Sequence, residues 1–272
     1  MSARPRPPQA VRLAELTYEE AQQRLATGAV GLLPVGATEA HGPHLPLGTD
    51  VVIALAAAER AALRVRGAGH EALVLPPLAY AVTEFAAGFA GTLSVPAATA
   101  RALVRDVLLA AHRTGLRGVV LCNAHLEPAH LQVLRDAVTE AAAQGARAEF
   151  PDVTRRPHAL RLGDEFRSGA CHAGRYETSL VLAAEPFLVR ESLARSLPDN
   201  PVSLSRAIRE GKASFEQAGG PRAYFGAPAA ASAAEGDALL ETLADIFATA
   251  ALELLDRATS VSAAGDRGTH EV

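Results

Sequence analysis

Two short apolar runs constrain this chain most, because each leads through a polar loop into a helical pattern. The runs are Ala29–Val35 (AVGLLPV) and Gly118–Cys122 (GVVLC). A continuous apolar run of this length is expected for a strand buried on both faces. Strands that alternate with helices form parallel sheets with right-handed connections. The sequence therefore predicts an α/β fold whose functional loops lie beyond the carboxyl ends of the strands.

Other segments complete this alternation. Ala72–Leu78 and Ala146–Phe150 are predicted to be further strands, and Pro198–Gly226 is predicted to be mostly loop. Five segments have the apolar spacing or the end signals of helices: Thr17–Ala26, Asp50–Val65, Ala97–Thr114, Leu131–Gln144 and Ala233–Thr259.

Three details refine the helix predictions. Thr17 and Glu20 have the spacing of a capping box. Asp50 is well placed to cap the helix that it opens. In Ala97–Thr114, the buried face is expected to include Leu103.

Composition excludes several classes of partner. The formal charge of the 272 residues is −4, which offers nucleic acid and anionic membranes no electrostatic attraction. The apolar segments are interrupted by charged residues before they reach the ~18 residues of a membrane-spanning helix. Two cysteines are too few for a disulfide framework. We expect a cytoplasmic protein of one domain, residues 1–272, with flexible ends at 1–12 and 260–272.

Potential metal ligands gather in the loops that follow both apolar runs. Glu39, His41 and Asp50 follow the first run, and His125 and Glu127 follow the second. Each E-x-H or H-x-E pair can direct two ligands to the same side of an extended backbone, and Asp50 adds a carboxylate suited to bridging. Two histidines and three carboxylates suit Zn²⁺, Mn²⁺ or Fe²⁺ and are too rich in nitrogen for a Ca²⁺ site. The coincidence points to a dinuclear hydrolase.

These loops also carry a family resemblance. The stretch from Pro34 to Asp50, PVGATEAHGPHLPLGTD, resembles the opening motif of the creatininase (creatinine amidohydrolase) family. Three later segments are similar to further motifs of that family, in the same order along the chain: Gly91–Ser94 (GTLS), His172–Ser179 (HAGRYETS) and Ala231–Gly236 (ASAAEG).

The resemblance implies a three-layer α/β/α sandwich with a mostly parallel sheet, usually assembled as a homo-hexamer. It also implies two divalent transition metal ions, Zn, Mn or Fe, in a site that hydrolyses a C–N amide-type bond. Five residues fall on the family's metal-ligand positions, with Asp50 as the bridge: Glu39, His41, Asp50, His125 and Glu127. His172 falls on the family's catalytic histidine, and Glu177 on the acid of the E-T-S motif.

The implied chemistry uses a water molecule that two metal ions make acidic enough to attack a carbonyl group at neutral pH. We expect His172 to give the departing nitrogen its proton, since a histidine titrates near neutral pH. Glu177 is expected to assist this step, although an acid in the first turn of a helix can also serve the helix dipole. His44 and His130 are assigned structural roles, and Cys171 is either an inert small residue or a thiol of the site.

The chain departs from the family where substrate is bound. It contains no Trp, whereas creatininases close tryptophans over their ring-shaped substrate. Ala86 and Ala90 stand where many relatives have His and Pro, and Leu126 stands where creatininases have an aromatic residue. We therefore expect hydrolysis of a small amide, lactam or formamide other than creatinine. A peptidase or deformylase of the same family and a non-catalytic metal- or ligand-binding homologue remain alternatives.

Overall fold

The computed structural model describes residues 11–265, and it contains a parallel sheet of four strands. The strands are β1 (Val30–Val35), β2 (Ala72–Val74), β3 (Val119–Asn123) and β4 (Ala148–Glu149), in the order β2-β1-β3-β4. All three neighbouring pairs are parallel. The prediction of a parallel α/β sheet is confirmed.

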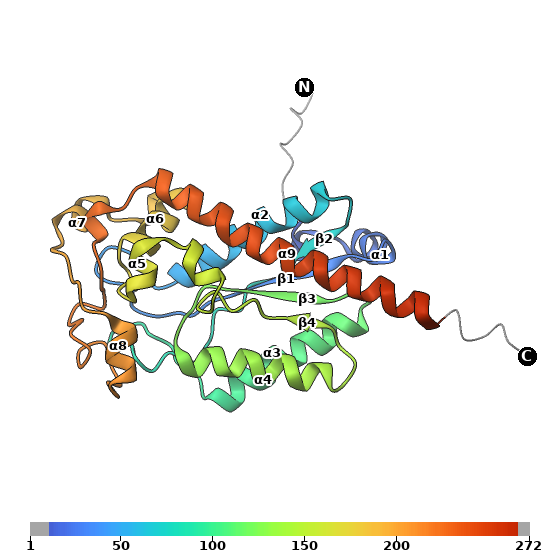
Figure 1. The fold of residues 1–272 in the computed structure, drawn as a ribbon, viewed down its shortest axis with the longest axis horizontal. Coiled ribbons are helices and arrows are strands. Elements are labelled where there is room, and N and C mark those ends of the chain that lie inside the picture. Colours follow the sequence, from blue (N-terminus) through green and yellow to red (C-terminus); the bar gives the residue numbers. More distant parts are fainter. Residues whose placement is uncertain (1–10, 266–272) are drawn as a thin grey trace, which may run out of the picture.

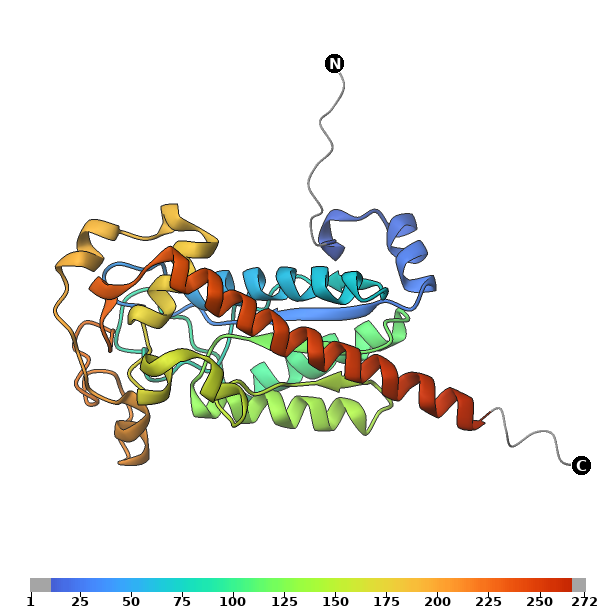
Figure 2. The same cartoon turned by 45° about the horizontal axis from the view of Figure 1, so that its top comes forward.

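Helices cover both faces of this sheet (Figures 1 and 2). One face packs against α2 (Thr49–Gly67) and α9 (Ala233–Gly265), and the other packs against α3 (Ala97–Arg113) and α4 (Pro128–Ala142). Helix α6 (Arg175–Ala184) packs against α2 and α9. The result is the expected three-layer α/β/α arrangement.

The alternation of side chains along β1 explains why both faces are covered. Val30 and Leu32 belong to the apolar cluster under α2 and α9, whereas Leu33 and Val35 belong to the cluster under α3 and α4. Because successive residues of a strand point to opposite faces, an uninterrupted apolar run needs a cover on each side. All six residues of β1 are buried.

Shorter elements follow the core sheet in the last half of the chain. At one end of the molecule, the short helices α5 (Gly163–Ser168), α7 (Glu191–Ser196) and α8 (Leu204–Arg209) lie around the region beyond the carboxyl ends of the strands (Figure 1). The remaining elements are α1 (Tyr18–Ala26) and the 3₁₀ turns Leu13–Glu15, His158–Arg161, Pro186–Leu188 and Pro228–Ala230. Within residues 11–265, we find no helix with both the length and the apolarity required to cross a bilayer.

Local signals placed several helix ends correctly. The hydroxyl of Thr17 accepts a hydrogen bond from the Glu20 amide, and the Glu20 carboxylate accepts one from the Thr17 amide, so the predicted capping box is formed. Gly115 and Gly145 follow α3 and α4 with φ angles of +99° and +87°. Such left-handed conformations suit glycine and end helices.

Four predicted details are wrong. Gly48 is the N-cap of α2, and Asp50 makes no capping hydrogen bond, because its carboxylate faces two histidines instead. β2 ends at Val74, shortly before two prolines that cannot donate ladder hydrogen bonds. β4 has two residues instead of five. Leu103 is 40% exposed, so it lies outside the buried face of α3.

The predicted flexible ends fall mostly outside the described residues. Their flexibility stays a prediction. The carbonyl group of Val11 accepts a hydrogen bond from the Val74 amide, which ties the chain to β2. At the other end, α9 extends to Gly265, six residues beyond the predicted end at Thr259.

Candidate metal centre

The loops beyond β1 and β3 bring the five predicted ligands together. Glu39 and His41 follow β1, Asp50 lies in the first turn of α2, and His125 and Glu127 lie between β3 and α4. Parallel strands end at the same edge of the sheet, so loops far apart in sequence meet there. None of the five side chains is exposed by more than 8%.

Gly36 allows the residue after β1 to lie directly against the start of α2. A Cβ atom at Gly36 would lie 2.6 Å from the backbone nitrogen of Val51 and 2.8 Å from Cβ of Asp50. Any larger residue would therefore push the end of β1 away from the start of α2. The absence of a side chain lets Asp50 sit directly beside the loop that carries Glu39 and His41.

Asp50 occupies the middle of the cluster. Its Oδ1 lies 3.2 Å from Nε2 of His41, and its Oδ2 lies 3.2 Å from Nδ1 of His125. The two oxygens of one carboxylate thus face two different histidines, as a bridging ligand requires.

Glu39 and Glu177 extend the cluster on either side. Oε1 of Glu39 lies 3.3 Å from Nδ1 of His125 and 3.7 Å from Nε2 of His41. Oε2 of Glu177 lies 3.5 Å from Nε2 of His41, on the side of the ring that also faces Asp50. The structure therefore brings Glu177 about as close to His41 as Glu39 and Asp50 are.

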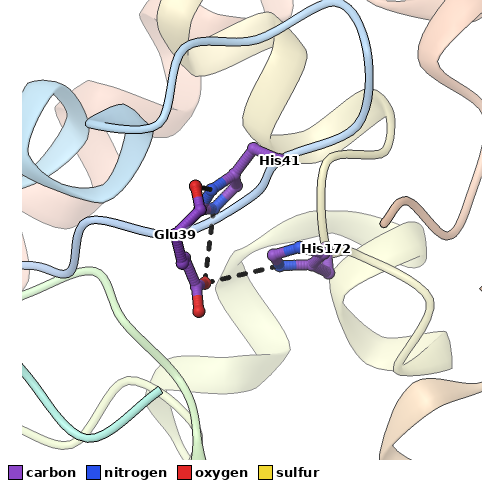
Figure 3. A group of neighbouring side chains, drawn as sticks. All are labelled: Glu39, His41 and His172. Carbon is purple, nitrogen blue, oxygen red and sulfur yellow. Dashed lines mark hydrogen bonds and ion pairs between the residues drawn. The ribbon is translucent and has the colours of Figure 1, made fainter. Parts of the chain in front are cut away.

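His172 reaches the same cluster from the loop before α6. Its Nδ1 lies 3.8 Å from Oε1 of Glu39 and 4.0 Å from Oε2 of Glu177. Figure 3 shows the rings of His41 and His172 on two sides of the Glu39 carboxylate. Their centroids are 4.4 Å apart. All seven predicted site residues therefore meet at one place.

Backbone carbonyl groups orient each histidine. His125 donates from Nε2 to the Val82 carbonyl oxygen at 2.8 Å, His41 from Nδ1 to that of Glu39 at 3.1 Å, and His172 from Nε2 to that of Ala40 at 3.0 Å. In each ring, the opposite nitrogen faces the carboxylates and can bind a metal ion once it has lost its proton. This division of the two nitrogens is typical of metal-binding histidines.

The donor set fits divalent metal ions. Nε2 of His41 and Oδ2 of Asp50 are buried without a hydrogen-bond partner, which is costly for polar atoms unless another group satisfies them. Three trios place one possible ligand atom per residue within 4.8 Å of one another: Glu39, His41 and His172; Glu39, His125 and Glu127; and His41, Asp50 and Glu177. Buried imidazole and carboxylate donors suit Zn²⁺ or Mn²⁺.

The charges of the cluster shift one another's pKa values. Burial acts to raise the pKa of Glu39, but the charge and hydrogen bond of His125, together with the charge of His41, outweigh burial and bring the pKa to about 2. Burial acts to lower the pKa of His41, but the Asp50 carboxylate raises it to about 10. Histidine protons here balance the carboxylates, and a divalent ion has to displace them in order to bind.

The pKa values of His172 and Glu177 shift in the directions opposite to those of His41 and Glu39. Burial, followed by the positive charge of His41, lowers the pKa of His172 to about 4. Burial raises the pKa of Glu177 to about 8. His172 is therefore neutral near pH 7, and its free Nδ1 is available to accept a proton.

The sequence analysis missed a segment that holds three of the ligands. In Val82–Phe85, the Val82 carbonyl group accepts from His125, the Thr83 hydroxyl donates to Glu39, and the amides of Glu84 and Phe85 donate to Glu127. We call these four residues the support segment. Most of these contacts use the backbone, so no residue type could have revealed them.

A second missed residue, Glu165, holds the loop of His172. Its carboxylate accepts hydrogen bonds from the amides of Tyr176, at 2.6 Å, and Ala227, at 2.8 Å. The Phe225 amide in turn donates to the carbonyl group of His172 at 2.8 Å. Glu165 lies in α5, outside every motif that the sequence offered, and its spacing to the site gave no signal.

A pocket with an empty volume of about 450 Å³ opens onto the cluster. Its floor consists of Glu39, Asp50, His125, Glu127, His172 and Glu177. Its walls consist of Phe85, Leu126, Leu204, Ile208 and Phe215, with Cys171 beside them. We use the names floor and walls for these two sets below.

His44 and His130 lie outside the floor, as predicted. Nε2 of His44 is 2.8 Å from the Thr178 hydroxyl, and Nε2 of His130 donates to Oδ1 of Asn123 at 3.1 Å. Cys122 is buried in the core of β3, and the cysteine that borders the pocket is Cys171.

Comparisons with known proteins agree with this geometry. The family model described as creatinine amidohydrolase matches residues 14–251. The mycofactocin precursor peptide peptidase of Mycobacterium ulcerans is 31% identical over 237 residues, which cover 86% of this chain and 88% of that protein. The creatinine amidohydrolase of Pseudomonas putida is 33% identical over 200 residues, which cover 66% of this chain and 74% of that protein.

A solved structure gives the same result for the fold. The structure named "Creatininase Mn" is 27% identical, with a TM-score of 0.70, over 89% of this chain and 97% of that chain. The residues that the family model matches include the sheet and the loops that carry the candidate metal centre. The chain belongs to the creatininase family.

Proposed function

We propose that this protein is a metal-dependent hydrolase that cleaves a C–N amide-type bond with a metal-activated water molecule. One observation carries the proposal: the two carboxylate oxygens of Asp50 face His41 and His125 separately, each at 3.2 Å. A lone structural ion pair does not need this arrangement, whereas two neighbouring divalent ions do. The family membership of the chain supports the same reaction class.

The ligands divide into two groups that share Asp50. We propose that Glu39, His125 and Glu127 hold one ion and that His41 and Glu177 hold the other. This changes the expected role of Glu177 from an acid to a ligand. The reason is its position: Oε2 of Glu177 is 3.5 Å from His41, whereas it is 4.0 Å from His172.

Two divalent ions in these positions would supply a hydroxide at neutral pH and would polarise the carbonyl group of the substrate. The protein supplies the proton transfer. Nδ1 of His172 is free because Nε2 donates to the Ala40 carbonyl group. We propose that this nitrogen accepts the proton that the attacking water loses and passes it to the departing nitrogen.

The relatives favour two different amide bonds. The mycobacterial relative is named a peptide peptidase, and the Pseudomonas putida relative is named a creatinine amidohydrolase. We retain a small non-peptide amide as the leading substrate, because the chain has no Trp to cover a creatinine ring and departs from its relatives along the pocket. A peptide substrate is the second candidate, since the named peptidase matches more of this chain.

Metal content gives the first test. We expect about two equivalents of transition metal per purified chain, as a dinuclear site requires, and a clear loss of metal in His125→Ala. His112→Ala, at an exposed position of α3, is the matched control and keeps its metal. A stable wild-type protein that binds no metal would contradict the proposal.

Turnover gives the second test. A panel of lactams, formamides and short peptides is assayed with the metal-loaded protein and after chelation. We expect hydrolysis of at least one class that disappears with the metal. Sedimentation analysis of the same sample tests the expected homo-hexamer, which remains a prediction.

A further inference from the structure

We propose that the pocket recognises its substrate through a neutral, apolar group attached to the scissile amide, and that α8 determines this preference. The inference rests on the proposed function, because it assumes that the reacting bond lies over the floor. It adds the chemical class of the substrate: an amide whose side chain is aliphatic or aromatic and carries no charge.

The walls contain no group that can pair with a charge. Phe85, Leu126, Leu204, Ile208 and Phe215 are all hydrocarbon side chains. Among the described residues that line the pocket, there is no Lys, Arg, Asn, Gln, Ser, Thr or Tyr. A carboxylate or ammonium group of the substrate would lose its water against these walls and gain no partner in return.

Once metal is bound, the floor does not supply the partner for a charged substrate group that the walls lack. It contributes four carboxylates, those of Glu39, Asp50, Glu127 and Glu177, which balance the charge of two divalent ions. Neither a cationic nor an anionic substrate then gains a net attraction from the floor. The hydrophobic effect at the walls is left as the main source of discrimination.

Phe215 fixes the walls beside the reacting groups. Its amide donates to the carbonyl group of Phe85 at 3.0 Å, and the two rings lie 6.2 Å apart. The same ring lies 4.3 Å from that of His172. With 3% exposure, Phe215 is an anchored part of the fold, so the apolar surface adjoins the residue that transfers the proton.

Leu204 and Ile208 complete the walls from α8. They are four residues apart, so they lie on the same side of that helix. Both are only partly buried, which leaves their side chains available to a ligand and makes substitution tolerable. Substitutions at these two positions are therefore expected to alter the preference for an apolar substrate group most directly.

The test uses hydroxamic acids, which bind metal through one end and present a chosen tail to the walls. Acetohydroxamate, hexanohydroxamate, 6-aminohexanohydroxamate and the monohydroxamate of adipic acid are titrated into the metal-loaded protein by calorimetry. We expect hexanohydroxamate to bind at least about ten-fold more tightly than acetohydroxamate, because up to four additional methylene groups become buried. The charged analogues should gain little or nothing over acetohydroxamate.

Variants of α8 sharpen the test. Ile208→Lys should weaken hexanohydroxamate and favour the anionic adipic derivative, whereas Glu210→Lys, at an exposed position directly after α8, controls for added charge outside the pocket. Ile208→Ala is the milder variant and should weaken hexanohydroxamate while leaving acetohydroxamate unchanged. Equal binding of charged and neutral tails, no gain from the longer tail, or an unchanged ranking in both Ile208 variants overturns the proposal.

The two proposals fail separately. If the ranking holds but no amide is hydrolysed, the preference for apolar ligands stands and hydrolysis is lost. If amides are hydrolysed but charged ones are preferred, the proposed hydrolysis stands and the proposed preference for apolar substrates is wrong.

Discussion

The floor and the walls of the pocket are built in different ways. The floor collects buried charged groups from three loops at one edge of the sheet, and most of their polar atoms have a defined partner. The walls collect apolar side chains, several of them from a region after residue 198 that has little regular structure. The difference separates two tasks: the floor performs the chemistry, and the walls select what reaches it.

The largest expected effect comes from removing the centre of the floor. Asp50→Ala should abolish binding of both metal ions and all metal-dependent turnover, a greater loss than the ~10–100-fold typical of residues that merely support a ligand. Metal analysis and activity are measured together. Asp106→Ala, at an exposed aspartate paired with Arg105, is the control and retains both. Retention of one full equivalent of metal in Asp50→Ala would argue against a shared ligand.

Substitutions of His172 and Glu177 distinguish the metal ligands of the floor from the residue that transfers the proton. His172→Gln should retain its metal and lose roughly 10²–10⁴-fold in kcat, the usual contribution of a general acid or base. Glu177→Gln should instead lose metal, if Glu177 is a ligand as proposed. Metal content and kcat are determined for both. If His172→Gln lost metal and Glu177→Gln kept it, the two roles would be exchanged.

A third substitution tests the support segment. Thr83→Val removes the hydroxyl that donates to Glu39 and should lower metal affinity by about 10–100-fold without changing the ligand set. Competition with a chromophoric chelator gives the affinity. Thr139→Val, on the exposed face of α4, should have no effect. An unchanged affinity in Thr83→Val would mean that the backbone contacts alone hold the ligands.

His44 is buried beside the floor and is expected to affect the stability of the protein without affecting turnover. Burial, with the positive charges of His41 and Arg222, lowers the pKa of His44 to about 4. Because the unfolded histidine has a pKa of about 6.5, the unfolded chain takes up a proton first as pH falls. The His44 contribution to stability is therefore complete above about pH 6.5 and declines towards pH 4, by on the order of 3 kcal/mol at most.

Denaturant unfolding of the chelator-treated protein between pH 4 and pH 8 measures this contribution. His44→Gln has no titrating group at this position, so its free energy of unfolding should fall less steeply with decreasing pH than that of the wild type. Parallel curves for the two proteins would show that His44 does not contribute.

The sequence predicted the floor because metal ligands are recognisable as residue types. Glu39, His41, Asp50, His125 and Glu127 follow buried strands, and parallel strands end at a common edge. The role of Glu177 was harder to predict, since an acid in the first turn of a helix has an ordinary structural explanation. Its proximity to His41 becomes evident only when α6 is placed against α2.

The support segment and, apart from Leu126, the walls were beyond prediction for a physical reason. Most contacts of Val82–Phe85 use backbone groups, which every residue possesses. Leu204 and Phe215 look like ordinary apolar residues of a loop, and only tertiary packing brings both into the pocket and places the Phe215 ring against His172. The fold itself was predictable because the continuous apolar runs of β1 and β3 require cover on both faces.

Phe85 belongs to both the support segment and the walls, and this dual position provides a route by which ligand binding and metal binding can be coupled. Its amide holds the Glu127 carboxylate, while its side chain lines the pocket. A ligand that presses on the ring therefore acts on the backbone that positions a candidate metal ligand. If bound metal strengthens ligand binding by a given factor, thermodynamic reciprocity requires that the ligand strengthens metal binding by the same factor.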